Sequence, residues 1–360
     1  MKILLPKRVA ETIMIAAMSD SITQMVESYD PANLFEVLAN SHAQVTRAME
    51  RPLPAVKAPA GPRQVLMCGM GGSAISGDLA ADLLGGELRL PFMVNRAYGL
   101  PAWAGRETLV VAASYSGNTE ETISCLEEAL GRGCPALCIT NGGAVGAIAE
   151  KAGLPVFPLD PGLQPRYALY SGLFTLLRAL HAAGVAGDQT EFAAKVVTHL
   201  EQSSSRHAGG GEALEMARRL FGMIPLVYSA EGMTNGAGLR FKAQLNENGK
   251  THAFHAALPE MNHNEIVGWE GASSGLAAVF LMDREYHPRV LRRFEVLHAL
   301  LEGAGVGVHV VSGGVPDRKL RLLDMVYFCD WVSYYIALLG GRDPGEIDAI
   351  DRMKKELSRR

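Results

Sequence analysis

Two glycine- and serine-rich segments of this sequence have the residue types that hold a phosphate group. They read GMGGSA over residues 69–74 and SYSGNTEE over residues 114–121, and each follows an apolar run and precedes a helical pattern. A turn that opens a helix presents free backbone N–H groups and the positive end of the helix dipole, and both favour an anion. Hydroxyl groups can donate further hydrogen bonds to phosphate oxygens. We therefore predict a phosphate site formed by Gly71, Gly72, Ser73, Ser114, Ser116 and Thr119.

Each segment also has an interpretation without a bound phosphate. In the second segment the polar side chains can simply cap the helix, and Glu121 could complete a capping box with Asn118. The first segment satisfies the dinucleotide pattern G-x-G-x-x-A, which is typical of nucleotide-dependent oxidoreductases. That pattern needs an acidic residue after the next strand, and the run PFMVN ends in Asn95 and Arg96 instead. This disfavours NAD and leaves a weak case for NADP.

The chain that must position these turns alternates short apolar runs with helical stretches. The runs are QVLMCGM, PFMVN, TLVVAAS, CPALCIT and LPVFPL in the first half, and IPLVYSA, HAFHA, LAAVFLM and GVHVVS in the second. Strands that alternate with helices predict parallel sheets covered on both faces. A strand, a turn of small residues and a helix occur at QVLMCGMGGSAISGDLA and again at IPLVYSAEGMTNGAGLRFK. We interpret this as a degenerate duplication that gives an α/β protein with two related domains.

The domain boundaries follow from changes in this pattern. The segment QSSSRHAGGGE over residues 202–212 is rich in serine and glycine, which is typical of a break between domains. The predicted order is an N-terminal helical segment at 1–60 packing on the first domain, a first domain at 61–200, a linker at 201–215, a second domain at 216–340 and a C-terminal helix at 341–360.

Composition excludes several classes of protein. Hydrophobic residues make up 48% and charged residues 20% of the 360 residues, and the net charge is -4. This indicates a well-packed globular chain without a nucleic-acid partner, so any phosphate must be held locally. No cluster of His, Cys or carboxylate residues has metal-ligand spacing, and Cys134 and Cys138 lack a matching second pair. We therefore expect no metal.

The same composition predicts where the protein resides. The five cysteines are an odd number and lie mostly in apolar stretches, which is typical of reduced cysteines in a cytoplasmic protein. The N-terminus does not follow the pattern of a signal peptide, and no run approaches the roughly 20 apolar residues that cross a bilayer. We expect a cytoplasmic protein with no membrane partner.

These segments resemble a known family. GMGGSAISGD and SYSGNTEET resemble the sugar isomerase (SIS) domain, a flavodoxin-like α/β unit that binds phosphosugars. FKAQLNENGKTHAF, LPEMNHNEIVGW and DWVSYYIALLGGRDP resemble the bifunctional phosphoglucose/phosphomannose isomerases. The resemblance covers roughly residues 25 to 357. It implies two SIS domains, a hexose 6-phosphate substrate, no cofactor, and interconversion of glucose 6-phosphate, and of mannose 6-phosphate, with fructose 6-phosphate.

The resemblance also implies individual roles. It places the family's phosphate-binding hydroxyls on the four Ser and Thr residues already chosen. It implies that Glu247 in LNENGK is the catalytic base, that His263 in MNHNE opens the sugar ring, and that Arg166 in LQPRYA is the active-site arginine. The C-terminal lysine falls on Lys354, which is preferred over Lys355 because it follows the apolar residues of that helix at matching spacing. A homodimer is implied too, because His263 crosses to the neighbouring subunit's site in the resembling family.

The chemistry explains these residue types. One carboxylate can remove a proton from C1 or C2 and return it to the other carbon. A fixed guanidinium stabilises the negative charge of the enediolate intermediate. An imidazole can exchange protons near neutral pH while the ring opens. The implied mechanism is a metal-independent proton transfer through a cis-enediolate.

Alternatives to this function remain open. A non-catalytic sugar-phosphate-binding regulator would keep the phosphate residues and would not need Glu247, Arg166 or His263. Another SIS enzyme that acts on amino or pentose sugar phosphates is also open. Ile347 stands seven residues before Lys354, where a hydroxyl is expected in some members, so the sequence supports glucose 6-phosphate better than mannose 6-phosphate. We expect His252, His255 and His309 to be structural.

Overall fold

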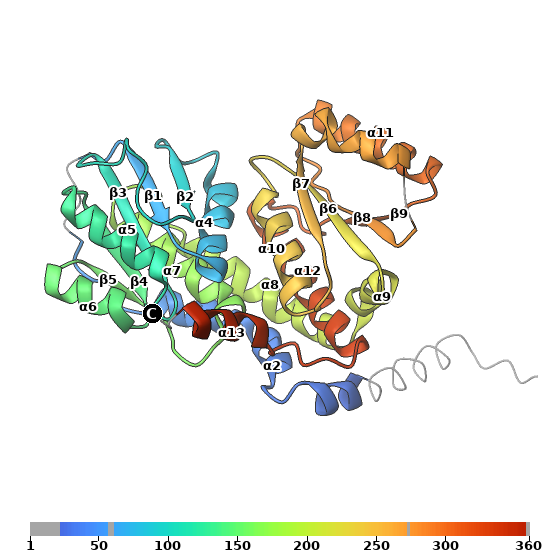
Figure 1. Cartoon of the computed structure of the whole chain (residues 1–360), viewed down its shortest axis with the longest axis horizontal. Coiled ribbons are helices and arrows are strands. Elements are labelled where there is room, and N and C mark those ends of the chain that lie inside the picture. Colours follow the sequence, from blue (N-terminus) through green and yellow to red (C-terminus); the bar gives the residue numbers. More distant parts are fainter. Residues whose placement is uncertain (1–21, 57–60, 272–273, 358–360) are drawn as a thin grey trace, which may run out of the picture.

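The computed structural model describes residues 22–56, 61–271 and 274–357, and it contains two parallel β-sheets covered by helices (Figure 1). The first sheet has the order β2-β1-β3-β4-β5. Its strands are β1 (Gln64–Cys68), β2 (Phe92–Asn95), β3 (Thr108–Ser114), β4 (Ala136–Thr140) and β5 (Val156–Pro158). Its helices are α4 (Gly71–Leu84), α5 (Glu120–Gly131), α6 (Gly143–Ala152) and α7 (Leu169–Ala182), with the short helix η1 (Pro165–Tyr167) before α7.

The second sheet repeats this winding with the order β7-β6-β8-β9. Its strands are β6 (Ile224–Ala230), β7 (Phe254–Leu258), β8 (Leu276–Leu281) and β9 (Gly307–Val311). The helices of this half are α8 (Thr190–Ala208), α9 (Gly211–Leu220), α10 (Asn235–Glu247), η2 (Glu260–His263), η3 (Glu265–Gly271), α11 (Pro288–Gly303), α12 (Arg318–Leu339) and α13 (Asp348–Leu357). The two-domain α/β fold is therefore confirmed, and the orders 2-1-3-4-5 and 2-1-3-4 are those of flavodoxin-like units.

Both faces of each sheet are buried, which explains the continuous apolar runs. Val65 and Met67 of β1 enter a large core shared by the two halves, whereas Leu66 and Cys68 enter a smaller core under α5 and α6. The second sheet likewise has the shared core on one face and a separate core under α11 on the other. Period-2 alternation is hidden in the sequence because both sets of side chains are apolar.

Helix α12 passes through the shared core. It lies against α8, α9 and α10, and its aromatic side chains also reach the first half, where Trp331 contacts Phe35 and Tyr327 contacts Tyr170. Among the described helices, α12 has the length and composition of a membrane span, although the sequence was expected to hold no such run. Because 89% of its most apolar window is buried inside the protein, it is a core helix here.

The N-terminal helices pack beside the first sheet. Residues 22–29 are helical, and α2 (Leu34–Ala39) and α3 (Ser41–Glu50) follow. Helix α3 lies against α7 and α8, and the Gln44 side chain donates to the carbonyl of Tyr167 at 2.8 Å. Residues 1–21 of the predicted N-terminal segment lie outside the described residues.

The structure corrects the prediction of a linker at residues 201–215. Residues 201–215 are nearly all helical, since α8 continues to Ala208 and α9 begins at Gly211. The reason is a buried stripe along α8 at helical spacing, formed by Val196, Leu200, Ser203 and His207. The serines that suggested a loop belong to a helix that this stripe stabilises.

Candidate active site

The two predicted phosphate turns lie next to each other at one edge of the first sheet. Strands β1 and β3 are adjacent and parallel, and the turns follow their C-terminal ends. The backbone N–H of Tyr115 donates to Oγ of Ser73 at 3.2 Å, which joins one turn to the other. The chain winds to β2 on one side of β1 and to β3 on the other, so this is the topological switch point where α/β sheets bind ligands.

The helices that open at these turns have no side-chain caps. Neither Met70, at the start of α4, nor Thr119, at the start of α5, makes a side-chain cap hydrogen bond. Asn118 does not form the alternative capping box with Glu121, because its Oδ1 accepts from the N–H of Ala144 in α6 at 3.1 Å. The capping interpretation is therefore not supported, and two helix N-termini point their first N–H groups toward the same edge.

The four candidate hydroxyls differ in exposure. Ser116 is exposed, and Ser73 and Thr119 are half-buried. Ser114 is buried, and its Oγ accepts from the N–H of Gly117 at 3.0 Å and lies 2.9 Å from Oγ1 of Thr119. Ser114 therefore shapes the turn, whereas the other three hydroxyls remain reachable by a ligand.

Glycine is required at the centre of this turn. Gly117 has a φ of 72°, and a Cβ there would lie 1.8 Å from the carbonyl oxygen of Gly142. Any other residue would force the loop apart.

Arg166 and Glu247 come together, although they are 81 positions apart in the chain. Nη1 of Arg166 donates to Oε1 of Glu247 at 3.0 Å. The guanidinium is buried and fixed in place, because Nε donates to Oδ1 of Asn248 at 2.7 Å and Nη2 donates to the carbonyl of Pro344 at 2.8 Å. The Glu247 side chain is 31% exposed, so the carboxylate faces an open space beside a fixed positive charge.

A buried ion pair between Arg240 and Asp330 supports the backbone of Arg166. Nε and Nη2 of Arg240 donate to the two carboxylate oxygens of Asp330 in α12 at 2.9 and 2.8 Å. The same Nη2 donates to the backbone carbonyl of Arg166 at 2.9 Å. The sequence analysis did not identify Arg240 or Asp330. A signal for Arg240 was available, because Arg240, Gln244 and Glu247 follow the i, i+4, i+7 spacing that places them on one helix face.

Lys250 fixes the end of α10, which carries the candidate base. Its Nζ donates to the carbonyls of Glu247 at 2.9 Å and Asp343 at 2.8 Å. Burial, together with the nearby Arg166, lowers the pKa of Lys250 below its usual range. This residue was also missed, and its place two residues after LNEN gives no sequence signal of its role.

A small cavity connects the first turn to this pair. Its volume is about 160 Å³, and it is lined by Gly71, Gly72, Arg96, Arg166, Arg240 and Glu247 among others. The turn is pressed against η1, because a Cβ on Gly72 would lie 2.7 Å from the carbonyl oxygen of Pro165. Small-molecule sites are usually about 300–1,000 Å³, so this cavity alone is smaller than a usual ligand site.

A second cavity of about 450 Å³ lies on the other side of Glu247. It is lined by Lys250, His252, Ile347 and Ile350 among others. His252, expected to be structural, thus lies near the candidate base. His255 contacts Oγ of Ser229 at 2.8 Å, and burial lowers its pKa to about 4.

His263 is not brought to Glu247 within one chain. Helix α10 starts just after β6 and ends at the opposite edge of the second sheet, and its 13 residues span roughly 20 Å. His263 ends η2, the short helix that follows β7, and β7 is parallel to β6 and pairs Leu258 with Ala230. His263 therefore lies at the edge where α10 begins, and Glu247 lies at the edge where α10 ends.

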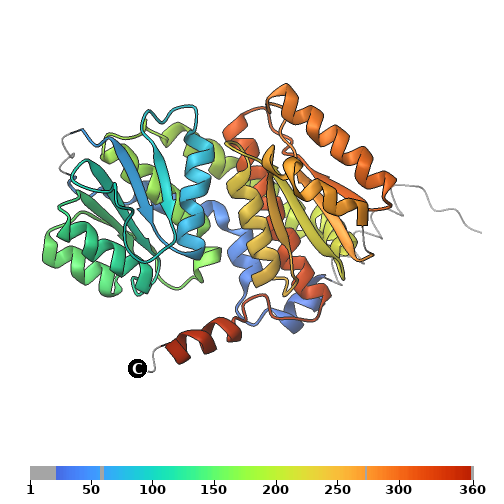
Figure 2. The same cartoon turned by 45° about the horizontal axis from the view of Figure 1, so that its top comes forward.

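Lys354 is exposed on α13, one turn beyond Ile350, and it does not line either cavity. Helix α13 projects from the rest of the chain in Figure 2, and none of its residues is buried. Among the described residues, no group of three or more His, Cys, Asp or Glu side chains is arranged to hold a metal ion.

Comparison with known proteins identifies relatives among the sugar-phosphate isomerases. A model described as the bacterial phospho-glucose isomerase C-terminal SIS domain matches residues 210–357. The chain is 38% identical over 298 residues to a bifunctional phosphoglucose/phosphomannose isomerase of Aquifex aeolicus, covering 82% of this chain and 90% of that one. It is also 34% identical over 230 residues to a D-glucosamine-6-phosphate 4-epimerase of Sulfolobus acidocaldarius, covering 61% of this chain and 67% of that one.

Solved structures share the fold. A hypothetical protein of Thermus thermophilus superposes with a TM-score of 0.64 at 16% identity, and the match covers 97% of this chain and 96% of that chain.

Proposed function

Because the chain belongs to the bifunctional phosphoglucose/phosphomannose isomerase family, we propose that it interconverts glucose 6-phosphate and fructose 6-phosphate, and that it accepts mannose 6-phosphate. The observation that supports this best is the Glu247–Arg166 pair, held at 3.0 Å beside a cavity that begins at the phosphate turns. A regulator that only binds sugar phosphate would have no use for a partly exposed carboxylate next to a fixed guanidinium.

Each residue then has a defined task. The phosphate is held by the N-termini of α4 and α5 and by Ser73, Ser116 and Thr119, which anchors one end of the sugar. Glu247 removes the proton from C2 of the aldose and returns it to C1, while the hydroxyl proton of O2 passes to O1, so the carbonyl moves from C1 to C2. Arg166 stabilises the enediolate that forms between these steps. Its hydrogen bonds to Asn248 and Pro344 fix the orientation of the guanidinium while the negative charge develops.

Replacing the base tests the mechanism. Glu247→Gln keeps the shape and removes the basic oxygen, so turnover should fall by the roughly 10²- to 10⁴-fold that a positioned general base supplies, while sugar phosphate still binds. In heavy water the wild-type enzyme should place solvent deuterium at C2 of the recovered aldose, because the carboxylate can exchange the proton that it holds. Full activity of Glu247→Gln would contradict the assignment.

We propose further that the enzyme is a homodimer with shared sites. Glu247 and His263 lie at opposite edges of the second sheet, so a His263 that opens the sugar ring near Glu247 must come from a second copy. Two-fold symmetry then builds two equal sites, each with Glu247 and Arg166 from one subunit and His263 from the other.

Mixing inactive variants tests this arrangement. Glu247→Ala mixed with His263→Ala should regain about a quarter of wild-type activity, since half of the dimers are mixed and each has one intact site. Glu247→Ala mixed with Arg166→Ala is the matched control and should regain none, because both residues belong to the same half-site. If His252 opened the ring within one chain instead, His263→Ala would stay active and the shared site would be wrong.

Lys354 completes the proposed site from α13, whose first turn already lines the cavity beside Glu247 through Ile350. The five cysteines are free and buried, which supports the proposal that the protein resides in the cytoplasm.

A second candidate function follows from the amino-sugar relative. The 34% identity to a D-glucosamine-6-phosphate 4-epimerase favours testing glucosamine 6-phosphate as a substrate. Turnover of the amino sugar faster than that of glucose 6-phosphate would replace the first proposal.

A further inference from the structure

The outer strand of the second sheet has an open edge. In the first sheet the equivalent strand β4 is buried along its whole length, because β5 pairs with its outer side. Strand β9 holds the same place in the second sheet, and no described strand pairs with its outer side. Gly307 and Val310 are exposed, with Val310 49% accessible. A valine-rich edge of this kind is usually covered in a stable protein.

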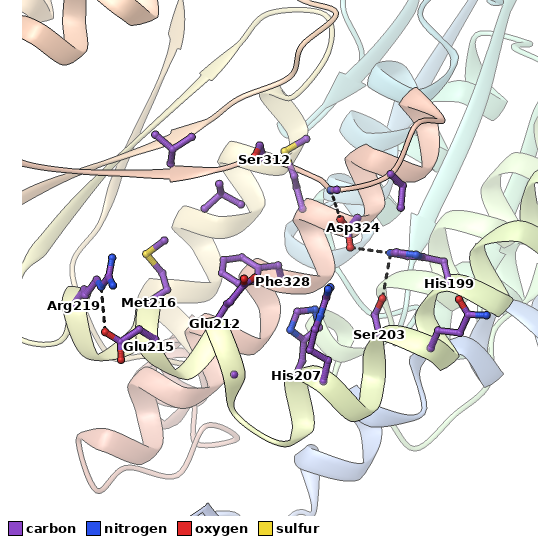
Figure 3. Close-up of a pocket in the computed structure, with 18 residues that line it drawn as sticks. His199, Ser203, His207, Glu212, Glu215, Met216, Arg219, Ser312, Asp324 and Phe328 are labelled. Atoms are coloured by element: carbon purple, nitrogen blue, oxygen red, sulfur yellow. Dashed lines mark hydrogen bonds and ion pairs between the residues drawn. The ribbon is translucent and has the colours of Figure 1, made fainter. Parts of the chain in front are cut away.

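A cavity lies on each face of the sheet at β9, and we call each of these two cavities a hollow. A cavity of about 930 Å³ lies between β9 and helices α8, α9 and α12 (Figure 3), and a cavity of about 530 Å³ lies between β9 and α11. Val310 and Ser312 line both cavities. In the first sheet Phe157 of β5 is buried in the equivalent space. Alternate side chains of a strand point to opposite faces, so one added strand would enter both hollows.

One polar side chain that lines the larger hollow lacks a hydrogen-bond partner among the described residues. His207 is buried, and neither ring nitrogen has a hydrogen-bond partner among the described residues. Beside it, Nε2 of His199 contacts Oδ1 of Asp324 at 2.8 Å, as Figure 3 shows. Buried polar groups are usually satisfied, so the His207 ring offers a hydrogen-bonding group to a segment that fills the hollow.

We propose that the occupant is the chain's own N-terminal segment, with residues 3–6 adding to β9 in the place that β5 takes in the first sheet. The segment reads KILLPKR over residues 2–8, and β5 reads VFP over residues 156–158. Both have two large apolar residues followed by proline, and a proline can end such a strand because it has no N–H to donate. Both acidic and basic residues line the hollow, and Glu215 is paired with Arg219, so Glu212 is the carboxylate that the flanking lysines and arginine match.

The described chain begins beside this hollow. Ile22 packs against Gly210, since a Cβ on Gly210 would lie 2.9 Å from Cδ1 of Ile22. The next residues, Gly211 and Glu212, line the larger cavity. The 15 residues between Pro6 and Ile22 span about 22 Å as a helix and about 50 Å when extended. The segment can therefore reach β9 without a second molecule.

Cysteine cross-linking of the full chain tests the occupant. Leu4→Cys and Leu5→Cys are each combined with Val310→Cys, and the five natural cysteines remain because they are buried. Under mild oxidation one of the two pairs should form a disulfide within one chain, detected by mass spectrometry of an unreduced digest. Glu11→Cys with Val310→Cys is the control and should remain reduced. A disulfide between two chains would show that a second copy fills the edge, and either that result or the absence of any disulfide overturns the proposal.

Hydrogen exchange gives an independent measurement. Removing residues 2–8 leaves every proposed catalytic residue in place and should speed amide exchange in residues 307–311 by at least about tenfold. A synthetic peptide of residues 1–9, added to the shortened protein, should restore the protection. Equal exchange in the two proteins would overturn the proposal, as would a shortened protein that the peptide does not protect.

Discussion

The contact between the phosphate turn and Arg166 predicts a large effect from adding one methyl group. In Gly72→Ala the new Cβ would lie 2.7 Å from the carbonyl oxygen of Pro165, about 0.7 Å closer than the 3.4 Å at which ordinary contact begins. The neighbouring atoms belong to the backbone, with the N–H nitrogen of Arg166 at 3.2 Å, so no flexible side chain can move aside. The turn and η1 must separate.

The size of the effect follows from this displacement. Overpacking of this kind costs about 1–3 kcal/mol of unfolding free energy. A misplacement of about 1 Å at a catalytic group can cost roughly 10²-fold in rate, so we expect kcat to fall roughly 10- to 100-fold. The KM for sugar phosphate should rise less, because Ser116 and Thr119 are not displaced.

Gly86→Ala is the matched control. It makes the same chemical change just after α4, where a Cβ would meet nothing within 4 Å. Its activity should equal that of the wild type, and its stability should be equal or higher by about 0.4–1 kcal/mol. Steady-state kinetics with fructose 6-phosphate and urea unfolding measure both quantities. A folded Gly72→Ala enzyme with wild-type kcat would show that the close approach does not position Arg166.

Further predictions test the site and its support. Replacing both Ser116 and Thr119 by Ala should raise KM strongly, since each charge-assisted hydrogen bond contributes about 1.5–3 kcal/mol, and an unchanged KM would remove the phosphate site from this turn. Asp330→Asn leaves Arg240 as a buried charge without its partner, so the unfolding free energy should fall by about 3–5 kcal/mol in denaturant titration, and a smaller loss than that of a surface Asp→Asn change would contradict the buried pair. Activity should survive exhaustive chelation, because in the proposed mechanism Glu247 moves the proton without a metal; activity lost to a chelator and restored by zinc would refute this. Burial raises the pKa of Asp82 to about 7, so the folded state binds a proton that the unfolded state has released. Stability should therefore decline from about pH 4 to pH 7, and Asp82→Asn should lack this decline in unfolding measured across that range.

Local features of the fold could be predicted from the sequence because they depend on neighbouring residues. Each strand is a short run of apolar residues, and parallel strands buried on both faces require such runs. The two turns were recognisable because glycine and hydroxyl residues cluster between an apolar run and a helical pattern. The serine-rich end of α8 was misjudged as a linker because its stabilising stripe consists of single residues spaced a turn apart.

Other features depend on contacts between distant residues. Nothing near Asp330 in the sequence indicates that it pairs with Arg240, 90 residues away, because the pair depends on the packing of α10 against α12. The positions of Glu247 and His263 at opposite sheet edges follow only once β6 and β7 are known to be parallel neighbours. Residue types thus indicated the chemistry, whereas the separation of Glu247 and His263 within one chain became visible only in the topology.

The central position of α12 has a consequence for synthesis of the protein. Phe35 and Tyr170 pack on Trp331 and Tyr327, so the first half of the chain leaves the ribosome long before the helix that completes its core. At about 5–20 residues per second, the roughly 160 residues between Tyr170 and Trp331 take about 8–32 s to translate. During that interval the nascent first half exposes apolar surface, and it should bind holdase chaperones until residue 339 has emerged.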